Sequence, residues 1–284
     1  MGQDLLAYLP DWVAPTPAFC QLVTSVVVIL IMIHVILVSC AYAIMLERKL
    51  SAWMQDRVGP NRVGPAGLLQ PIADGLKFLM KEEFTPRGVE KALFMLAPSF
   101  ILIPAMLAFV IVPWGGVLEL SQLPFGLAQT LGVEGVTVRF TGASVNVGMI
   151  YLLAVASLGV YGVALGGWAS NSKFSFLGGM RASAQMISYE IPMGLALLCV
   201  ILTAGTLDPY GIIGAQTHGQ GAWMLLQQPV AAILFYTCML AESNRAPFDL
   251  AEAESELVGG YHTEYSSMRF AMFFLAEYFH MITG

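Results

Sequence analysis

Charged residues are scarce in this sequence. Only 11 % of its 284 residues are Asp, Glu, Lys or Arg, whereas 57 % are hydrophobic, and the mean hydropathy is +0.72. A soluble domain usually carries about a quarter charged residues, so this chain has too few charges to cover a globular surface. Most of its surface is therefore expected to face lipid.

Clustered metal ligands are also lacking. The four cysteines and four histidines are scattered along the chain, and none forms a CxxC or CxH pattern. Zinc, haem and iron–sulfur ligation are therefore not expected, and we predict no metal and no covalently bound cofactor. A signal peptide is not expected either, because Asp4 and Asp11 stand where its basic residues would be.

Residues 47–91 hold eight of the thirteen Lys and Arg residues, between long apolar runs. Basic loops resist translocation, so this segment is expected on the cytoplasmic or matrix side. The resulting alternation puts twelve of the thirteen bases on that side and only Arg139 on the other. Anionic lipid headgroups explain a basic loop beside a membrane, and we predict no nucleic-acid partner.

Apolar runs of bilayer length predict an all-α polytopic membrane protein with one domain, residues 1–284. At least six transmembrane helices are expected, near 22–46, 92–113, 145–169, 183–203, 222–240 and 268–284. The cytoplasmic loops would be 47–91, 170–182 and 241–267. The alternation of Val136, Val138 and Phe140 with polar residues indicates a short external strand. Gly162 and Gly166 are spaced for close helix packing.

Residues 66–81 predict an amphipathic surface helix, because Leu69, Ile72, Leu76 and Leu79 share one face. It is too polar to span a bilayer. One interpretation is a lipid-surface anchor. The other is that the helix walls a cavity, with Asp74 and Lys77 pointing inward.

Carboxylates stand where a bilayer disfavours charge. Glu190 and Glu277 lie within predicted spans, so they are expected to face a protein interior or a wet cavity, or else to remain protonated and hydrogen-bonded. The segment 241–257 crowds five acids around Arg245, and Glu264 follows it. Crowded carboxylates titrate as a coupled group, which suits proton storage and transfer. The alternative is that the segment 241–257 is simply a solvated acidic loop. Its five acids are Glu242, Asp249, Glu252, Glu254 and Glu256.

Three groups of motifs resemble the quinone-site membrane subunit of respiratory complex I. The first is Glu47-Arg-Lys-Leu-Ser-Ala-Trp through Asp74-Gly-Leu-Lys77, and the second is Arg181-Ala-Ser-Ala-Gln-Met-Ile-Ser-Tyr-Glu190. The third comprises Glu242-Ser-Asn-Arg-Ala-Pro-Phe-Asp249, Glu252-Ala-Glu-Ser-Glu-Leu-Val258 and Glu277-Tyr278. This family includes the H subunit of bacterial NADH:quinone oxidoreductase and mitochondrial subunit 1.

The resemblance implies a subunit that holds no redox centre, takes quinone as substrate and joins the membrane arm to the peripheral arm. Its quinone chamber would be lined or braced by Glu47, Arg48, Gln55, Arg57 and Asp74. An acidic path coupling quinone reduction to proton pumping would contain Arg181, Glu190, Glu242, Arg245, Asp249, Glu252, Glu254, Glu256, Glu264 and Glu277.

The resemblance also implies partners and a location. The partners would be the quinone-site and iron–sulfur subunits of the peripheral arm, the antiporter-like membrane subunits and membrane lipid. The location would be the bacterial inner membrane or the mitochondrial inner membrane. Family members continue with further spans beyond the sixth, so we expect C-terminal spans to be missing from this chain.

Two alternatives stay open. The equivalent anchor subunit of a membrane-bound hydrogenase or formate-linked complex shares this scaffold and need not bind quinone. A stand-alone secondary transporter fits less well, because the sequence shows no internal repeat and its basic amphipathic loop resembles a docking platform.

Overall fold

The computed structural model describes residues 17–122, 133, 135–218, 223–245, 247–249 and 259–284. Four helical segments in this part of the chain are long and apolar enough to cross a membrane. They are α2 (Pro17–Met54), α4 (Lys91–Ala108) with the short η2 (Phe109–Ile111), α6 (Gly148–Ala169) and α7 (Lys173–Ala204). The all-α polytopic prediction is confirmed.

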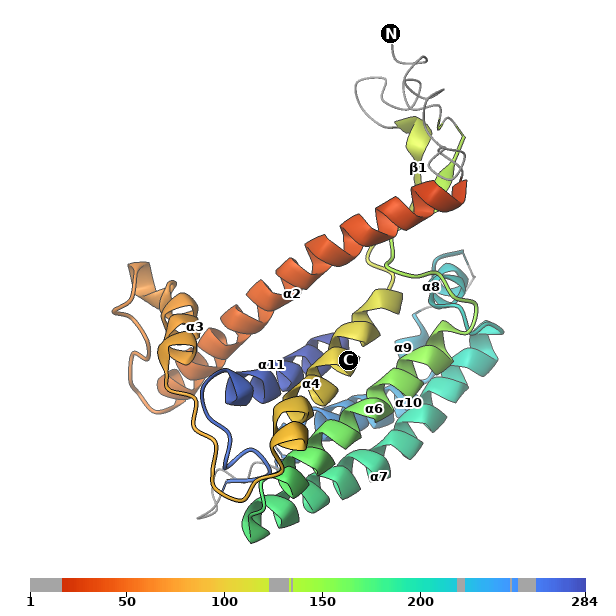
Figure 1. Cartoon of the computed structure of the whole chain (residues 1–284). Coiled ribbons are helices and arrows are strands. Elements are labelled where there is room, and N and C mark those ends of the chain that lie inside the picture. Colours follow the sequence, from red (N-terminus) through yellow and green to blue (C-terminus); the bar gives the residue numbers. More distant parts are fainter. Residues whose placement is uncertain (1–16, 123–132, 134, 219–222, 246, 250–258) are drawn as a thin grey trace, which may run out of the picture.

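The core lies where α4 packs between α6 and α11 (Ser267–Thr283) (Figure 1). Glycines allow the close approach: a Cβ added to Gly162 would lie 2.6 Å from the backbone nitrogen of Ile101, and one on Gly166 would lie 3.2 Å from Phe273. The predicted packing role of these two glycines is confirmed. Pro98 and Pro104 of α4 are buried in the same core.

Helix α2 is longer than the predicted span 22–46, because no proline interrupts the chain between its first residue, Pro17, and Met54. Its 38 residues extend about 57 Å, well beyond a bilayer core of about 30 Å. Residues 47–54, predicted as loop, therefore form the last turns of a rigid helix. We call this the basic end of α2.

Each end of α2 is anchored to other elements. At its N-terminal end the Gln21 side chain exchanges two hydrogen bonds with the backbone of Arg139, in the strand β2 (Thr137–Arg139) that pairs antiparallel with β1 (Val117–Glu119). The predicted short strand is confirmed by this pairing. At the basic end, α2 meets α3 and α11.

The predicted surface helix is α3 (Gln70–Met80), preceded by the 3₁₀ turn η1 (Pro65–Gly67). It crosses the basic end of α2 (Figure 1). The hydroxyl of Ser267 donates to the backbone oxygens of Phe78 and Lys81, at 2.8 and 3.0 Å, and so ties the C-terminal end of α3 to the start of α11. The apolar residues Ile72, Leu76 and Leu79 remain exposed, as a lipid-facing side would require.

The loop predicted at 170–182 is wrong beyond Ser172, because α7 already begins at Lys173. The residues that this stretch buries are small: Ser175, Gly178, Gly179 and Ala182. A Cβ on Gly179 would lie 3.2 Å from the Cα of Gly167, so α6 and α7 touch through their backbones. This contact stabilises a polar stretch as helix.

The predicted span 222–240 is interrupted. Gln228 has φ −130° and ψ 61°, outside the helical region, and separates α9 (Met224–Gln227) from α10 (Pro229–Glu242). Proline disfavours a helical conformation in the residue before it, which explains the break. With 14 residues, α10 extends about 21 Å, less than a bilayer core.

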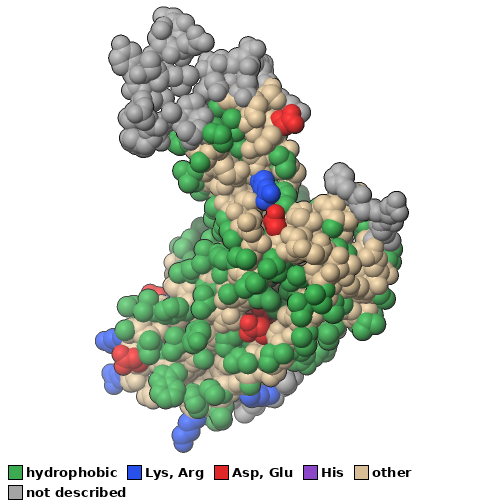
Figure 2. Space-filling model, turned by 90° about the vertical axis from the view of Figure 1, so that its right-hand side faces the viewer, with side chains coloured by type: hydrophobic (Ala, Val, Ile, Leu, Met, Phe, Trp, Pro, Cys, Tyr) green, Lys and Arg blue, Asp and Glu red, His purple; other side chains and the backbone are tan. Residues whose placement is uncertain are grey.

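The remaining elements lie near the N-terminal end of α2. They are the 3₁₀ turn η3 (Leu120–Gln122) and the helix α8 (Pro209–His218). The face in Figure 2 is mostly hydrophobic, and most of the Lys and Arg side chains visible on it gather toward the bottom of the view.

Candidate functional site

The basic end of α2 carries an ion pair with α3. Nη1 of Arg48 lies 2.5 Å from Oδ2 of Asp74, whose other carboxylate oxygen accepts a hydrogen bond from Gln70 at 3.1 Å. Lys77 is farther from Asp74, at 3.9 Å, and is largely exposed. Of the two residues that the cavity interpretation placed inward, Asp74 lines a pocket between α2 and α3, and Lys77 does not line that pocket.

A second charged group joins three distant segments of sequence. Nη1 of Arg245, just after α10, lies 3.3 Å from a carboxylate oxygen of Glu47 on α2. The hydroxyl of Tyr278 on α11 donates to the same carboxylate. The Arg245 guanidinium also lies 4.2 Å from the centre of the Tyr278 ring, which is cation–π geometry.

These contacts hold Arg245 firmly in its charged form. Burial lowers the pKa of Arg245, but Tyr278 and the carboxylates of Glu47 and Glu277 raise it by more, so its pKa stands above the ordinary value. The guanidinium therefore interacts with Glu47, predicted to belong to the quinone chamber, and with Glu277, predicted to belong to the proton path. One residue of each predicted set thus interacts with the same cation.

Three adjoining pockets surround this charged group. The α2–α3 pocket, of about 320 Å³, lies between α2, α3 and α11. Its lining changes from apolar residues such as Leu37 and Ala41 to the polar Arg48, Gln70 and Asp74.

The other two pockets share Glu47, Phe274 and Tyr278 in their linings. The Arg57 pocket, of about 630 Å³, adds Arg57 and Arg48. The Asp249 pocket, of about 540 Å³, adds Arg245 and Asp249. Phe274 lines all three pockets, so they adjoin one another around its ring, and each has a lining of mixed polarity.

Glu277 is one residue before Tyr278 and faces the bundle interior. Its side chain is 2 % exposed, and one carboxylate oxygen accepts a hydrogen bond from the Tyr261 hydroxyl at 3.1 Å. His280, one turn further along α11, is buried against Gly159 of α6. The expectation that Glu277 faces a protein interior is met by this geometry.

Glu190 and Glu242 form a separate acidic pair. Glu190 lies beside Ser157 of α6, and Glu242 ends α10 close enough for the two carboxylates to repel each other. The buried amide of Gln185 fixes the chain after α10 by donating to the backbone oxygens of Ala241 and Phe248, each at 2.8 Å.

Other predicted site residues lie elsewhere. Gln55 and Arg181 are exposed, and neither lines the three pockets. Glu264 is partly buried in the turn before α11. Glu252, Glu254 and Glu256 lie outside the described residues.

Sequence reasoning missed Tyr278, Phe274 and Gln70. The first two could have been found, because Phe270, Phe274 and Tyr278 recur every four residues and so share one face of α11. Gln70 carries no such signal. Its role depends on how α3 is placed against α2. Among the described residues, no group of three His, Cys, Asp or Glu could hold a metal ion.

Comparisons with known proteins point to one family. The family model described as NADH dehydrogenase matches residues 27–284. One H subunit of the NADH-quinone oxidoreductase of Geobacter sulfurreducens, numbered 1, is 49 % identical over 261 residues, covering 92 % of this chain and 74 % of the relative.

Two further relatives have similar names. The first H subunit of Cytophaga hutchinsonii NADH-quinone oxidoreductase is 46 % identical over 260 residues, with 92 % of this chain and 72 % of the relative covered. The second H subunit of the Geobacter metallireducens enzyme is 47 % identical over 285 residues, with 100 % of this chain and 78 % of the relative covered.

Proposed function

The chain belongs to the NADH dehydrogenase family, as a membrane subunit of an NADH-quinone oxidoreductase, and we propose that the basic end of its helix α2 forms the quinone site. The resemblance read from the sequence motifs is thereby confirmed at the level of the family. The proposal concerns the finer point: which residues meet the quinone and how its reduction reaches the buried acids.

One observation carries the proposal, the graded lining of the α2–α3 pocket. Leu37, Ala41 and Phe270 line its apolar part, and Arg48, Gln70 and Asp74 line its polar part. A quinone has the same two parts, an apolar tail and a polar head whose two carbonyl oxygens accept hydrogen bonds. Apolar pockets with a few convergent polar groups are the usual form of small-molecule sites.

The polar groups supply the donors that a quinone head requires. Gln70 and Arg48 offer N–H groups on one side, and Arg57 and the Tyr278 hydroxyl line the neighbouring pocket. The head would move from the α2–α3 pocket past Phe274, which lines both spaces. Electrons would come from an iron–sulfur centre in another subunit, and reduction to quinol would take up two electrons and two protons.

Arg245 would pass the effect of reduction inward. A proton leaving the Tyr278 hydroxyl for the quinone would leave a phenolate beside the guanidinium, which is also 3.3 Å from the Glu47 carboxylate. Arg245 also interacts with Glu277, so this change alters the balance of charge at a buried acid. Glu190 and Glu242 would continue the path toward the antiporter-like subunits.

The orientation follows from the same proposal. The basic segment 47–91 would face the cytoplasm, or the matrix in a mitochondrion, where the peripheral quinone-site and iron–sulfur subunits dock. The relatives are bacterial, which favours the bacterial inner membrane.

The experiment uses the whole complex, purified through this chain in mild detergent. We expect Glu47→Gln and Asp74→Asn each to lower NADH:quinone reduction by about ten- to hundredfold, because each loses charge-assisted hydrogen bonds. Electron transfer from NADH to an artificial acceptor that bypasses quinone should persist. The matched control is Glu83→Gln, since Glu83 is also ion-paired, with Arg269 at 2.7 Å, but lines none of the three pockets.

Normal quinone reduction in both variants would overturn the proposed site. Co-purification tests the hydrogenase alternative in the same preparation: a flavin-bearing NADH module supports the proposal, whereas a nickel–iron hydrogenase contradicts it.

A further inference from the structure

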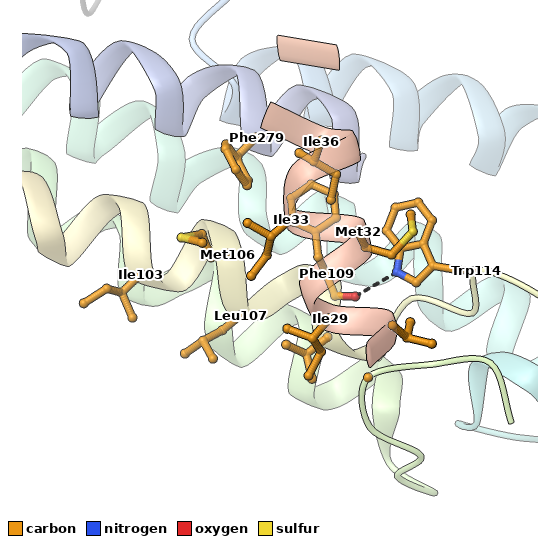
Figure 3. Close-up of a pocket in the computed structure, with 13 residues that line it drawn as sticks. Ile29, Met32, Ile33, Ile36, Ile103, Met106, Leu107, Phe109, Trp114 and Phe279 are labelled. Carbon is orange, nitrogen blue, oxygen red and sulfur yellow. Dashed lines mark hydrogen bonds between the residues drawn. The ribbon is translucent and has the colours of Figure 1, made fainter. Parts of the chain in front are cut away.

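A wholly apolar pocket lies beside the N-terminal half of α2. This α2–α4 pocket, of about 230 Å³, is lined by Ile29, Ile33 and Ile36 of α2, by Met106 of α4, by Phe109 of η2 and by Phe279 of α11 (Figure 3). The Trp114 indole also borders it, but its N–H donates to the backbone oxygen of Phe109 at 3.3 Å (Figure 3). The pocket therefore suits hydrocarbon.

An apolar space of this size favours an occupant. A cavity of about 150 Å³ lined by aliphatic and aromatic residues stays dry and binds benzene. The α2–α4 pocket is larger, and Trp114 and Gly142 are among the residues that line it. A Cβ on Gly142 would lie only 2.8 Å from both Ile29 and the backbone oxygen of Val110, so the chain packs tightly there.

The pocket continues the line of the α2–α3 pocket. Ile29 and Ile33 line the first, and Leu37, Ala41 and Met45 line the second, in a ridge with a residue every four positions that winds around α2. On α11, Phe279 lines the first pocket and Leu275, one turn away, lines the second. From Ile29 to Met45 this ridge extends about 24 Å.

We propose that the α2–α4 pocket binds the polyisoprenoid tail of the quinone whose head occupies the basic end of α2. The inference rests on the proposed quinone site and adds to it a separate tail site in the opposite half of the membrane. The order of the linings supports it: polar at Arg48 and Asp74, apolar along the ridge, and still apolar where Trp114 lines the α2–α4 pocket.

Charge favours a quinone over a phospholipid as the occupant. Arg48 is already paired with Asp74, and Arg245 with Glu47. A neutral head leaves these pairs intact, whereas a phosphate would compete with two carboxylates. The quinone tail is hydrocarbon throughout, so it needs no hydrogen-bond partner in the apolar pocket.

The test compares two quinones on the intact complex, one with a long isoprenoid tail and one whose ring carries no isoprenoid. In Ile33→Phe the added ring fills the α2–α4 pocket. We expect KM for the long-tailed quinone to rise about tenfold, because excluding about two methylene groups from an apolar site costs that factor. KM for the tail-less quinone should not change.

Ile31→Phe is the matched control. Ile31 is two residues away on the same helix, 49 % exposed, and does not line the pocket. It should leave KM for both quinones unchanged. Met106→Phe fills the pocket from α4 and should give the same result as Ile33→Phe. Agreement between the two variants would show that the effect does not come from local distortion of α2.

Three outcomes would overturn the inference. Equal changes in KM for both quinones would indicate general distortion. No change for either quinone in both filling variants would mean that the tail lies elsewhere. Loss of co-purifying phospholipid with unchanged KM would assign the pocket to a lipid acyl chain. The proposed head site is judged separately, since reduction of the tail-less quinone remains sensitive to Glu47→Gln if only the tail inference fails.

Discussion

Arg245 and Glu47, 198 positions apart in the sequence, meet with a nitrogen–oxygen distance of 3.3 Å against the ring of Tyr278. This contact links the longest helix of the described chain to the acidic segment after α10. It also explains why both segments carry conspicuous charged motifs: each supplies one half of a single charged group.

The first prediction concerns this ion pair. Arg245→Gln removes the cation between Glu47 and Glu277, so quinone reduction should fall by about ten- to hundredfold, the cost of charge-assisted hydrogen bonds. The measurement is inhibitor-sensitive NADH:quinone reductase activity of the assembled complex. Arg269→Gln is the control, because the Arg269 side chain is similarly buried, at 16 % exposed against 18 %, and pairs with Glu83 instead. Equal losses in the two variants would contradict a specific role for Arg245.

The second prediction separates electron transfer from proton transfer. Glu190→Gln should lower coupled quinone-reductase activity while the complex still assembles, because the acidic pair with Glu242 loses an ionisable member. In reconstituted vesicles, the same variant should also move fewer protons for each NADH oxidised. Glu119→Gln, an exposed carboxylate in β1, is the control. Normal coupled turnover in Glu190→Gln would remove Glu190 from the path.

The third prediction tests the packing of α6 on α4. Gly162→Val should destabilise the chain by about 1–3 kcal/mol or prevent its assembly, because overpacking forces backbone shifts. A Cβ at this position already approaches the Ile101 backbone nitrogen to 2.6 Å. Gly194→Val is the control, since its nearest neighbour is the Leu153 side chain at 3.9 Å. Thermal unfolding in detergent compares the two, and equal midpoints would show that α4 and α6 can separate at little cost.

The fourth prediction concerns pH. Burial between the rings of Tyr261 and Phe270 lowers the pKa of His262 to about 4, from about 6.5 in the unfolded chain. Between these values the unfolded chain binds more protons, so this histidine's contribution to stability falls as the pH drops from about 6.5 to about 4. Above pH 6.5 it should have no effect.

Melting temperatures at pH 7.5 and pH 5 measure this dependence. His262→Phe keeps an aromatic ring between Tyr261 and Phe270 but cannot titrate, so its melting temperature should fall less on acidification. Parallel decreases in the two proteins would exclude His262 as the source.

Much of the architecture could be predicted from the sequence because it depends on local pattern. Apolar runs gave the long helices, the spacing of Leu69, Ile72, Leu76 and Leu79 gave α3, and alternation around Val138 gave a strand. Helix ends were harder to predict. Polar residues do not end a helix that has another helix to pack against, and α7 therefore starts at Lys173 rather than after Arg181.

The candidate site was only partly predictable for a related reason. Motifs gave Glu47, Arg48 and Asp74 as residues, but not their partners. The contacts of Arg245 with Glu47 and Tyr278 join α2, the segment after α10 and α11, and such long-range pairing depends on how the helices are arranged. Gln55 and Arg181 show the converse, since both belong to quoted motifs and yet lie away from the pockets.

The exposure of α2 has a consequence for how its sequence can vary. Its backbone groups bond within the helix, so lipid demands only apolar side chains of whatever shape on the outward face. Ile31, Val35 and Val38 on that face can exchange freely with other aliphatic residues. Along the ridge from Ile29 to Met45, shape matters as well as polarity. Positions on α2 should therefore fall into two classes, one that tolerates any aliphatic residue and one that tolerates few. A survey of substitutions along α2 should find the less tolerant positions recurring every three or four residues.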